Sequence, residues 1–326
     1  MAARKPTVTI LTGSGEPLPP GLDPLPRRAE VRHADDADSL SEHLPGSEIL
    51  LVTDFRTDAL ARAWPQADRL RWIHATSAGV DAVLTDDVLA SDVTVTNARG
   101  IFDGAIAEYV LGAILMFAKD THTNIALQQR REWRHRDTER IAGKQLLVVG
   151  AGAIGRSIAR LCRAAGMRVQ GVARRARDED EDFESVYAID TLGAQLPQAD
   201  YVVVAAPLTP DTQHLFSTPQ FAAMRRSARF INIGRGPIVD TDALVRALRE
   251  NRIAGAALDV FEEEPLPADH PLWGMDNVLI SAHMAGDFVG WREALSRQFL
   301  DNLACWQAGE PLHNIVDKGR GYVPPR

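Results

Sequence analysis

The stretch Gly150-Ala151-Gly152-Ala153-Ile154-Gly155 decides the fold of this chain. It follows the apolar run Leu146–Val149, which predicts a buried parallel strand, and it precedes Ser157–Arg168, which predicts a helix. A strand, then G-x-G-x-x-G, then a helix is the arrangement in which these glycines indicate dinucleotide binding. The first glycine permits a tight turn, the second lets the backbone approach a pyrophosphate, and the third lets helix and strand pack closely. The N–H groups at the helix start then face the anion.

The second half of the chain continues this alternation of strands and helices. Apolar, β-branched segments predict six strands, at Leu146–Val149, Arg168–Val172, Tyr201–Ala205, Phe230–Ile233, Gly255–Asp259 and Asn277–Ser281. Helical patterns fill most of the intervals, for example Thr241–Glu250, where apolar residues recur at helical spacing. Six strands that begin with a phosphate-binding loop predict a complete doubly wound domain.

A shorter alternation precedes the glycine motif. It predicts strands at Thr7–Leu11, Ile49–Thr53, Leu70–Ala75 and Val93–Asn97, and long helices at Ile101–Lys119 and Trp291–Ala308. The fold class is therefore α/β, with two Rossmann-like doubly wound domains. We expect an NAD(P)-binding domain at 99–286, inserted into a substrate domain that is split between 1–98 and 287–326. Ligands of such folds bind outside the carboxyl ends of the strands, so we expect the active site in the cleft between the domains.

Composition and charge argue against several classes of protein. The chain has 326 residues, 45% of them hydrophobic, which allows two packed domains of about 100–200 residues each. Its net charge of −8 argues against a nucleic-acid partner, because phosphate binding needs clustered Lys and Arg. The longest apolar run, Tyr109–Ala118, is about half of a membrane span, which argues against a membrane protein.

Cysteine usage and the first residues predict a cytoplasmic protein. The sequence has two cysteines, Cys162 and Cys305, and Met1–Thr9 lacks the apolar core of a secretory signal. It contains neither Cys-x-x-Cys nor His-Glu-x-x-His, so we expect no metal site. The charged run Arg177–Glu184 is expected to be a solvated loop.

The residues after the second strand of the cofactor domain predict the coenzyme. Fingerprints that prefer NAD usually carry an acidic residue about 20 residues on, which holds the ribose 2′-hydroxyl. Here Ala173 stands eighteen residues after Gly155, and Arg174 and Arg175 follow it. Guanidinium groups can pair with a 2′-phosphate, so NADP(H) is the expected coenzyme, with NAD(H) possible. Alternatively, the two arginines belong to a solvated turn that balances the acidic residues after it.

Three charged residues lie at or beyond the ends of the later strands: Arg235, Glu264 and His283. They suit hydride transfer to a 2-oxo acid. Arg235 can bind the carboxylate and polarise the ketone, and protonated His283 can give a proton to the ketone oxygen. Glu264 can orient the imidazole and favour its protonated form. A lone His or Glu near a strand end is more often structural, so residue types alone leave this trio open.

The chain resembles the D-isomer-specific 2-hydroxyacid dehydrogenase family over nearly its whole length. The matching motifs are Ser77-Ala78-Gly79-Val80-Asp81, Ile106-Ala107-Glu108, Gly150–Gly155, Pro207-Leu208-Thr209-x-x-Thr212, Ile231–Gly236, Ala257–Pro265 and Ala282-His283. Glu264 lies 29 residues after Arg235, and His283 lies 19 residues after Glu264, as in the family. Two positions depart from the family pattern: Ala282 replaces a common Pro, and Ala206 replaces a frequent Cys.

The resemblance implies a role for each matching position. Arg235, Glu264 and His283 correspond to the catalytic trio, and the backbone of Ala78 and Gly79 corresponds to the loop that binds the substrate carboxylate. Asp259 corresponds to the residue that contacts the nicotinamide amide. Pro207 and Thr212 are expected to line the coenzyme groove, although a turn former and a helix cap would look the same. The full set expected to contact the coenzyme is Gly150, Gly152, Ala153, Ile154, Gly155, Arg174, Arg175, Pro207, Thr212, Ile233, Asp259 and His283.

The C-terminal residues Asn314–Tyr322 are similar to the tail of the glyoxylate and hydroxypyruvate reductase branch, which often favours NADPH. The resemblance therefore implies an NAD(P)-dependent oxidoreductase acting on the CH–OH group of donors, with a small 2-oxo or 2-hydroxy acid as substrate. It also implies a homodimer with the helix near 101–119 at the interface. Burial of that apolar helix within one subunit would give the same sequence pattern.

Two other functions remain open at this point. The same fold serves in some relatives as a dinucleotide-sensing, corepressor-like binding protein, and fold alone does not exclude this. The same reaction on a larger 2-oxo acid is the other alternative. Phe55 and Trp291 could wall the substrate pocket, but core packing for Phe55 and a domain interface for Trp291 are equally consistent with the sequence.

Overall fold

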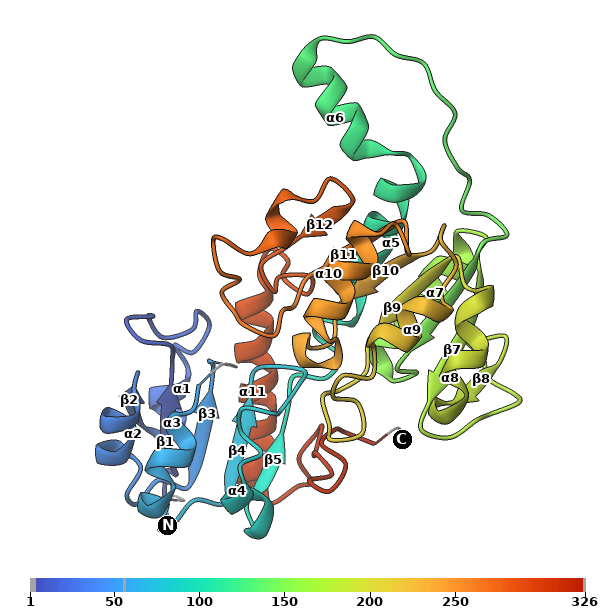
Figure 1. Ribbon diagram of the computed structural model, residues 1–326. Coiled ribbons are helices and arrows are strands. Elements are labelled where there is room, and N and C mark those ends of the chain that lie inside the picture. Colours follow the sequence, from blue (N-terminus) through green and yellow to red (C-terminus); the bar gives the residue numbers. More distant parts are fainter. Residues whose placement is uncertain (1–3, 55–56, 325–326) are drawn as a thin grey trace. The chain divides into compact units, whose positions relative to one another are not determined.

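The chain folds into two compact units, and the computed structural model describes residues 4–54 and 57–324 (Figure 1). Unit 1 is formed by Met1–Phe102 together with Phe288–Arg326, and unit 2 by the intervening Asp103–Asp287. Each unit contains one sheet of parallel strands with helices packed against it. The two parallel sheets confirm the predicted α/β fold class.

The sheet of unit 1 has five strands in the order β2-β1-β3-β4-β5. Their bounds are β1 Thr7–Leu11, β2 Glu30–Ala34, β3 Ile49–Val52, β4 Trp72–Ala75 and β5 Thr94–Thr96. Every residue of β1, β3 and β4 is buried, as expected for parallel strands covered on both faces. The order reverses between β1 and β3, so the sheet is doubly wound.

Helices cover both faces of the unit 1 sheet. They are α1 Leu25–Arg28, α2 Ala37–His43, α3 Ala59–Ala63, α4 Asp86–Ala90 and α11 Trp291–Ala308. Leu40, Leu60 and Val88 from α2, α3 and α4 belong to the core on one face. On the other face Phe299 of α11 stacks on Trp72, with ring centroids 5.4 Å apart. The C-terminal helix therefore completes the core of the N-terminal sheet, which explains why unit 1 is discontinuous in sequence.

The sheet of unit 2 has seven strands in the order β12-β11-β10-β9-β6-β7-β8. Their bounds are β6 Gln145–Val149, β7 Arg168–Ala173, β8 Val186–Ala188, β9 Tyr201–Val204, β10 Arg229–Asn232, β11 Gly255–Leu258 and β12 Val278–Ile280. The chain runs outward from β6 through β7 and β8, then returns to β9 and runs outward on the other side. The switch point of this doubly wound sheet lies between β6 and β9, which is where such folds bind dinucleotides.

The helices of unit 2 are α5 Asp103–Ala118, α6 Thr121–Arg130, α7 Ala153–Ala164, α8 Leu192–Gln195, α9 Thr218–Ala223 and α10 Thr241–Arg249. Helices α5 and α7 pack together on one face of the sheet, and α8, α9 and α10 on the other (Figure 1). Phe216, Phe221 and Phe230 pack ring to ring in the core under α9. None of the helices within residues 4–54 and 57–324 has the length and apolar character needed to cross a membrane.

Among the elements that the structure adds to those predicted from the sequence are β2, β8 and α6. Strands β2 and β8 are outer strands of their sheets, and β2 carries mostly polar, partly exposed residues. Such strands lack the apolar run that marks a central parallel strand. Helix α6 is polar, with Leu127 as its buried residue. Helix α7 begins at Ala153 rather than Ser157, so the last residues of the glycine motif lie in its first turn.

Candidate active site

The glycine motif forms the turn between β6 and α7 at the switch point of the unit 2 sheet. Gly152 is the N-cap of α7 and has no side chain to bond the first N–H groups of the helix. A Cβ atom at Gly155 would lie 2.0 Å from the carbonyl oxygen of Gly150, so only glycine lets the helix start so close to the strand. N–H groups at a helix start bind anions well. The turn therefore fits the pyrophosphate of a dinucleotide.

The segment after β9 lies on the other side of the switch point. Thr212 is buried, its hydroxyl oxygen accepts a hydrogen bond from the N–H of Thr209 at 2.8 Å, and it lies 2.7 Å from the carbonyl oxygen of Pro207. Thr212 thus closes the turn after Pro207 instead of capping a helix. Ile233 follows β10, is buried, and donates its N–H to the carbonyl of Val204 at 3.1 Å. The predicted groove residues therefore follow β6, β9 and β10, three neighbouring strands.

No carboxylate stands at the end of β7. The strand ends at Ala173, and Arg174 and Arg175 follow with exposed side chains. The strand next to β6 therefore delivers two guanidinium groups at the position where an NAD-preferring site carries an acid.

Arg235, Glu264 and His283 follow β10, β11 and β12, which are three adjacent strands of one sheet. The carboxyl ends of parallel strands meet at one edge, so the chain brings these segments together there. The Nδ1 atom of His283 lies 2.8 Å from Oε2 of Glu264. This contact engages Nδ1, one of the two ring nitrogens, and orients the imidazole ring.

Glu264 is held as a carboxylate in this site. Burial would raise the pKa of Glu264, but hydrogen bonds from His283 and from the N–H of Phe261, together with the nearby charge of Arg235, outweigh burial and hold the pKa below its usual value. The other carboxylate oxygen, Oε1, accepts the Phe261 N–H at 2.9 Å. Glu264 can therefore orient the imidazole and stabilise a positive charge on it.

The loop that carries Arg235 packs against the segment that carries Glu264. A Cβ atom at Gly236 would lie 1.9 Å from the backbone of Phe261, so a side chain there would force the two segments apart. The side chain of Asn232 holds the loop from the strand end, donating to the carbonyl of Arg235 at 3.1 Å and accepting from the N–H of Gly234 at 3.1 Å. Asn232 was not among the predicted site residues, although its place at the strand end is visible in the sequence.

Asp259 is buried and accepts hydrogen bonds from the loop around His283. Its Oδ1 atom accepts hydrogen bonds from the hydroxyl of Ser281 at 2.6 Å and from the N–H of Met284 at 2.9 Å, and its Oδ2 atom accepts from the N–H of Ala285 at 2.9 Å. The backbone carbonyl of Asp259 accepts from the N–H of His283 at 2.8 Å. Both carboxylate oxygens therefore position the loop that carries His283, which the role at the nicotinamide amide, implied by the family resemblance, does not include.

Tyr109 of α5 extends this network. Its hydroxyl lies 2.6 Å from the hydroxyl of Ser281, which donates its own proton to Asp259, so Tyr109 is the donor to Ser281. Burial raises the pKa of Tyr109 to about 12, and the charge of Asp259 raises it as well, so the phenol keeps its proton. Sequence reasoning missed Tyr109 because a tyrosine on a helix carries no local signal of a contact 172 residues away.

The backbone of His283 has a φ of 53°, in the left-handed region that non-glycine residues rarely adopt. A residue in this region costs about 1–3 kcal/mol unless its surroundings impose the conformation. The four hydrogen bonds that residues 281–285 donate to the side chain and carbonyl of Asp259 provide that constraint. The hydrogen bonds to Asp259 therefore hold the backbone of His283 in the conformation in which its imidazole contacts Glu264.

The predicted carboxylate-binding loop of unit 1 follows β4. Asn97 donates to the carbonyl of Ala78 at 2.6 Å, Ser77 donates its hydroxyl proton to the carbonyl of Gly79 at 2.5 Å, and the N–H of Ala98 donates to the carbonyl of Ser77 at 3.0 Å. Since these carbonyls are engaged within the chain, the loop can present amide N–H groups to an anion.

Of the two candidate pocket-wall residues, Trp291 begins α11 and packs against Phe102, with ring centroids 6.2 Å apart. The guanidinium of Arg292 lies 4.3 Å from the Trp291 ring centroid. Phe55 lies outside the described residues.

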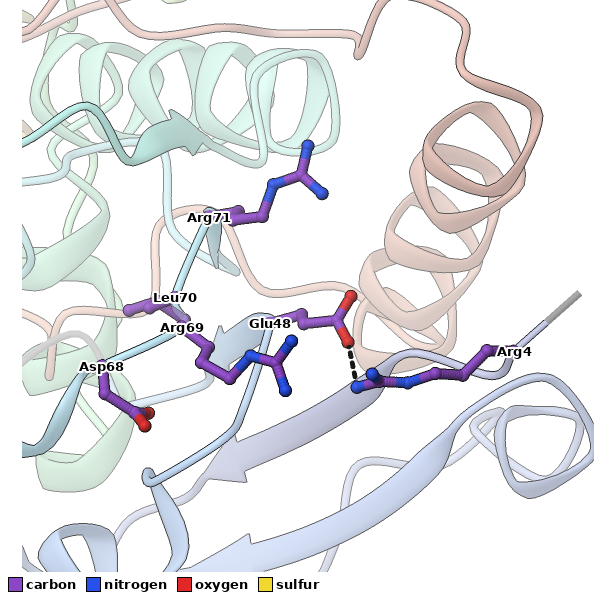
Figure 2. Close-up of a pocket in the computed structure, with 6 residues that line it drawn as sticks. All are labelled: Arg4, Glu48, Asp68, Arg69, Leu70 and Arg71. Atoms are coloured by element: carbon purple, nitrogen blue, oxygen red, sulfur yellow. Dashed lines mark hydrogen bonds and ion pairs between the residues drawn. The ribbon is translucent and has the colours of Figure 1, made fainter.

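A separate pocket lies at the amino ends of strands of the unit 1 sheet, at the end opposite to the loop of Ala78 and Gly79 (Figure 2). Arg4, Glu48 and the segment 68–71 line it, and they precede β1, β3 and β4. Arg4 forms an ion pair with Glu48 at 2.7 Å, while Arg71 lies 4.8 Å from the ring centroid of Trp306. The pocket is therefore at the amino ends of the strands, whereas Ala78 and Gly79 follow a carboxyl end.

The charged run Arg177–Glu184 is a loop as predicted, and Asp178, Glu179, Glu181 and Glu184 are exposed to solvent. The side chains of Asp180 and Asp182, however, are only 3% and 9% exposed, and both form ion pairs with Arg156 of α7. For these two residues the prediction was wrong, because the run was considered alone, whereas α7 places arginines opposite it. This loop connects the end of β7 to β8.

The chain belongs to the D-isomer specific 2-hydroxyacid dehydrogenase family, because residues 111–285 match the NAD binding domain of that family. It is similar to a glyoxylate reductase of Aeropyrum pernix, with 34% identity over 263 residues that cover 78% of each chain. It also matches a glyoxylate reductase of Thermococcus onnurineus, with 31% identity over 316 residues that cover 91% of this chain and 92% of that protein.

A solved structure is similar over the whole length. The NADPH-dependent glyoxylate/hydroxypyruvate reductase of Sinorhizobium meliloti, in complex with NADP and sulfate, has a TM-score of 0.83 and 29% identity, and the match covers 98% of this chain and 100% of that one. The predicted family and enzyme class are confirmed. The chain is an oxidoreductase acting on the CH–OH group of donors, and it binds a nicotinamide dinucleotide.

Proposed function

We propose that this enzyme reduces a small 2-oxo acid, such as glyoxylate or hydroxypyruvate, to the D-2-hydroxy acid with NADPH. The observation that carries this proposal is the 2.8 Å contact between Nδ1 of His283 and Glu264, in a site that Arg235 also enters. It combines a proton donor, a group that orients the donor, and a cation for the substrate carboxylate. The relatives named glyoxylate reductase support the small substrate.

The turn Gly150–Gly155 would hold the pyrophosphate, and the segments after β9 and β10 would line the rest of the coenzyme groove. When bound, the nicotinamide supplies a hydride to the carbonyl carbon of the substrate. Arg235 binds the substrate carboxylate and polarises the ketone, and the N–H groups of Ala78 and Gly79 assist with the carboxylate. Nε2 of His283 gives a proton to the carbonyl oxygen, so the ketone becomes a hydroxyl group. Unit 1 thus has the role of substrate domain.

A substrate screen tests the proposal. Purified protein is mixed with NADPH and with glyoxylate, hydroxypyruvate, pyruvate, phenylpyruvate or branched 2-oxo acids, and the loss of NADPH absorbance is measured. We expect the highest kcat/KM with glyoxylate or hydroxypyruvate. A preference for phenylpyruvate or branched acids would identify a larger substrate. NADPH binding without turnover of any substrate would contradict the reductase and support a sensor.

We propose NADPH as the preferred coenzyme because Ala173 stands in place of the acid that would repel a 2′-phosphate, and Arg174 and Arg175 follow it. The ratio of kcat/KM for NADPH to that for NADH should exceed one in the wild type. Replacing both arginines by glutamine should lower this ratio about 10–100-fold, since hydrogen bonds to charged groups contribute about 1.5–3 kcal/mol. NADH kinetics should stay unchanged and serve as the internal control. A wild-type ratio below one would contradict the assignment.

The resemblance implied a homodimer with the helix near 101–119 at the interface, but this helix, α5, packs against α7 within unit 2. We therefore propose a homodimer joined through α6 and the connection after it, residues 131–143. In Figure 1 this arm projects from the rest of unit 2, and it carries Ile125, 48% exposed, and Trp133, wholly exposed. Exposed apolar side chains on a projecting arm can pack against the same arm of a second copy, related by a twofold axis.

Sedimentation velocity tests the proposed dimer. Ile125→Asp with Trp133→Asp should give a monomer, whereas Trp273→Asp, at another exposed tryptophan, should stay dimeric. A monomeric wild type would contradict the dimer.

A further inference from the structure

The loop between β7 and β8 carries the two arginines proposed to select the coenzyme. Residues 174–185 contain no helix, and Arg174 and Arg175 are exposed at the start of the loop. Exposed arginines lose considerable side-chain and backbone freedom when they bind a ligand. If the loop is already ordered, less conformational entropy is lost on binding. The contacts that order this loop therefore affect the affinity for a 2′-phosphate.

Helix α7 binds the loop with three arginines, one on each of three successive turns. Arg156 forms two bonds with Asp180, at 2.7 and 2.8 Å, and one with Asp182 at 2.9 Å. Arg160 bonds Asp182 at 3.1 Å, and Arg163 donates to the carbonyl of Glu181 at 2.6 Å. Two parallel bonds between a guanidinium and a carboxylate fix direction as well as distance.

Further contacts tie the arginine end of the loop to the same cluster. Arg177 lies 3.2 Å from Asp180, and its backbone exchanges two hydrogen bonds with Val186, at 2.8 and 3.1 Å. Phe183 packs on Gly171 of β7, where an added Cβ atom would come within 3.1 Å of the ring. The two ends of the segment from Arg177 to Val186 are therefore joined by hydrogen bonds. This ordered segment begins only two residues after Arg175.

The ion pairs also matter for charge. Asp180 and Asp182 stand a few residues from the proposed 2′-phosphate position, where carboxylates would repel that phosphate. Their pairing with Arg156, Arg160 and Arg177 balances the negative charge. The buried carboxylates of Asp180 and Asp182 are therefore paired, although they lie close to the proposed 2′-phosphate position.

We propose that Asp180 and Asp182, held by the arginines of α7, are positioning residues that set the preference for a 2′-phosphorylated coenzyme. They act through the loop that presents Arg174 and Arg175, and they do not touch the coenzyme themselves. This inference rests on the proposed use of NADPH. It assigns specificity to two acidic residues, although acidic residues near this position usually oppose a 2′-phosphate.

The test uses two adenosine fragments of the coenzymes, so it does not depend on catalysis. Calorimetry gives the dissociation constants of adenosine 2′,5′-bisphosphate and of 5′-AMP, and the constant for 5′-AMP divided by that for the bisphosphate is a ratio that isolates the contribution of the 2′-phosphate. In the Asp180→Asn, Asp182→Asn double variant we expect bisphosphate binding to weaken about tenfold, with AMP binding unchanged. A mere charge effect has the opposite sign, because removing two carboxylates favours an anion.

Glu184→Gln is the matched control. Glu184 lies in the same loop and pairs with exposed Arg168 of β7 at 3.1 Å, so its removal changes the charge but not the bonds to α7. It should leave the ratio unchanged. If the double variant does not fold, Asp180→Asn or Asp182→Asn alone should lower the ratio about threefold.

The possible failures are distinguishable. A wild-type ratio near one would overturn the NADPH assignment and this inference with it. A clear wild-type preference for the bisphosphate that persists or increases in the aspartate variants would overturn only this inference. A fall in the ratio with Glu184→Gln equal to that of the double variant would also overturn it, since the bonds between the loop and α7 would then not be what sets the preference.

Discussion

Replacing His283 by alanine should lower kcat by about 10²–10⁴-fold, the usual contribution of a general acid. The imidazole is proposed to supply the proton that turns the reduced ketone into a hydroxyl group, and water would be a weaker, unoriented donor. The dissociation constant for NADPH should stay nearly unchanged, because most of the proposed coenzyme contacts lie in the glycine turn and in the loop after β7. Steady-state kinetics and fluorescence titration with NADPH measure the two quantities.

The left-handed backbone of His283 calls for a second variant and a matched control. Asparagine tolerates this conformation better than alanine does, so His283→Asn separates the loss of the imidazole from a change of the loop. His214 has a φ of 50° and also pairs with a glutamate, Glu262, at 2.9 Å, but it is half exposed. His214→Asn should keep the wild-type kcat. A His283→Asn enzyme with the wild-type rate would rule out the proton-donor role.

Replacing Arg235 by alanine should lower kcat/KM for the 2-oxo acid by about 10²–10³-fold, as expected when a cation that binds and polarises the reacting group is lost. The KM for the oxo acid should rise and kcat should fall, since Arg235 is proposed to bind the carboxylate and to stabilise charge on the ketone oxygen. NADPH binding should change little. Kinetics over a range of oxo acid concentrations, at saturating NADPH, measure both parameters.

Two further variants sharpen this prediction. Arg235→Lys keeps the charge but not the planar pair of donors, so it should restore only part of the activity. Arg246 on α10 has only a 3.4 Å side-chain contact with Thr218, and Arg246→Ala should behave like the wild type. If Arg235→Ala changes only NADPH binding, Arg235 belongs to the coenzyme site and not to the substrate site.

Local pattern was sufficient for much of the fold. The strand before Gly150 and the helix after it were predicted because buried parallel strands are continuous apolar runs and the glycines mark the turn between them. The predicted bounds Trp291–Ala308 coincide with α11. The strand ends that carry Arg235, Glu264 and His283 could be located for the same reason, and their spacing suggested the family.

Elements without such a pattern escaped prediction. Strand β2 is polar because it lies at the edge of its sheet, and β8 is only three residues long. The run Arg177–Glu184 was assigned to solvent because its partners, Arg156 and Arg160, lie on a helix more than fifteen residues earlier. Sequence reasoning assigns a charge to a residue but not the partner that neutralises it.

The sequence by itself determined the glycine turn, the positions of most strands along the chain and the identity of the residues at their ends, because each of these depends on neighbours in the chain. Only the tertiary structure decided how those residues are held. The left-handed His283, the carboxylate of Asp259 with Ser281 and Tyr109, and the pairing of Asp180 with Arg156 all join segments that are distant in sequence. Such contacts depend on the packing of helices against a sheet, and no local pattern encodes them.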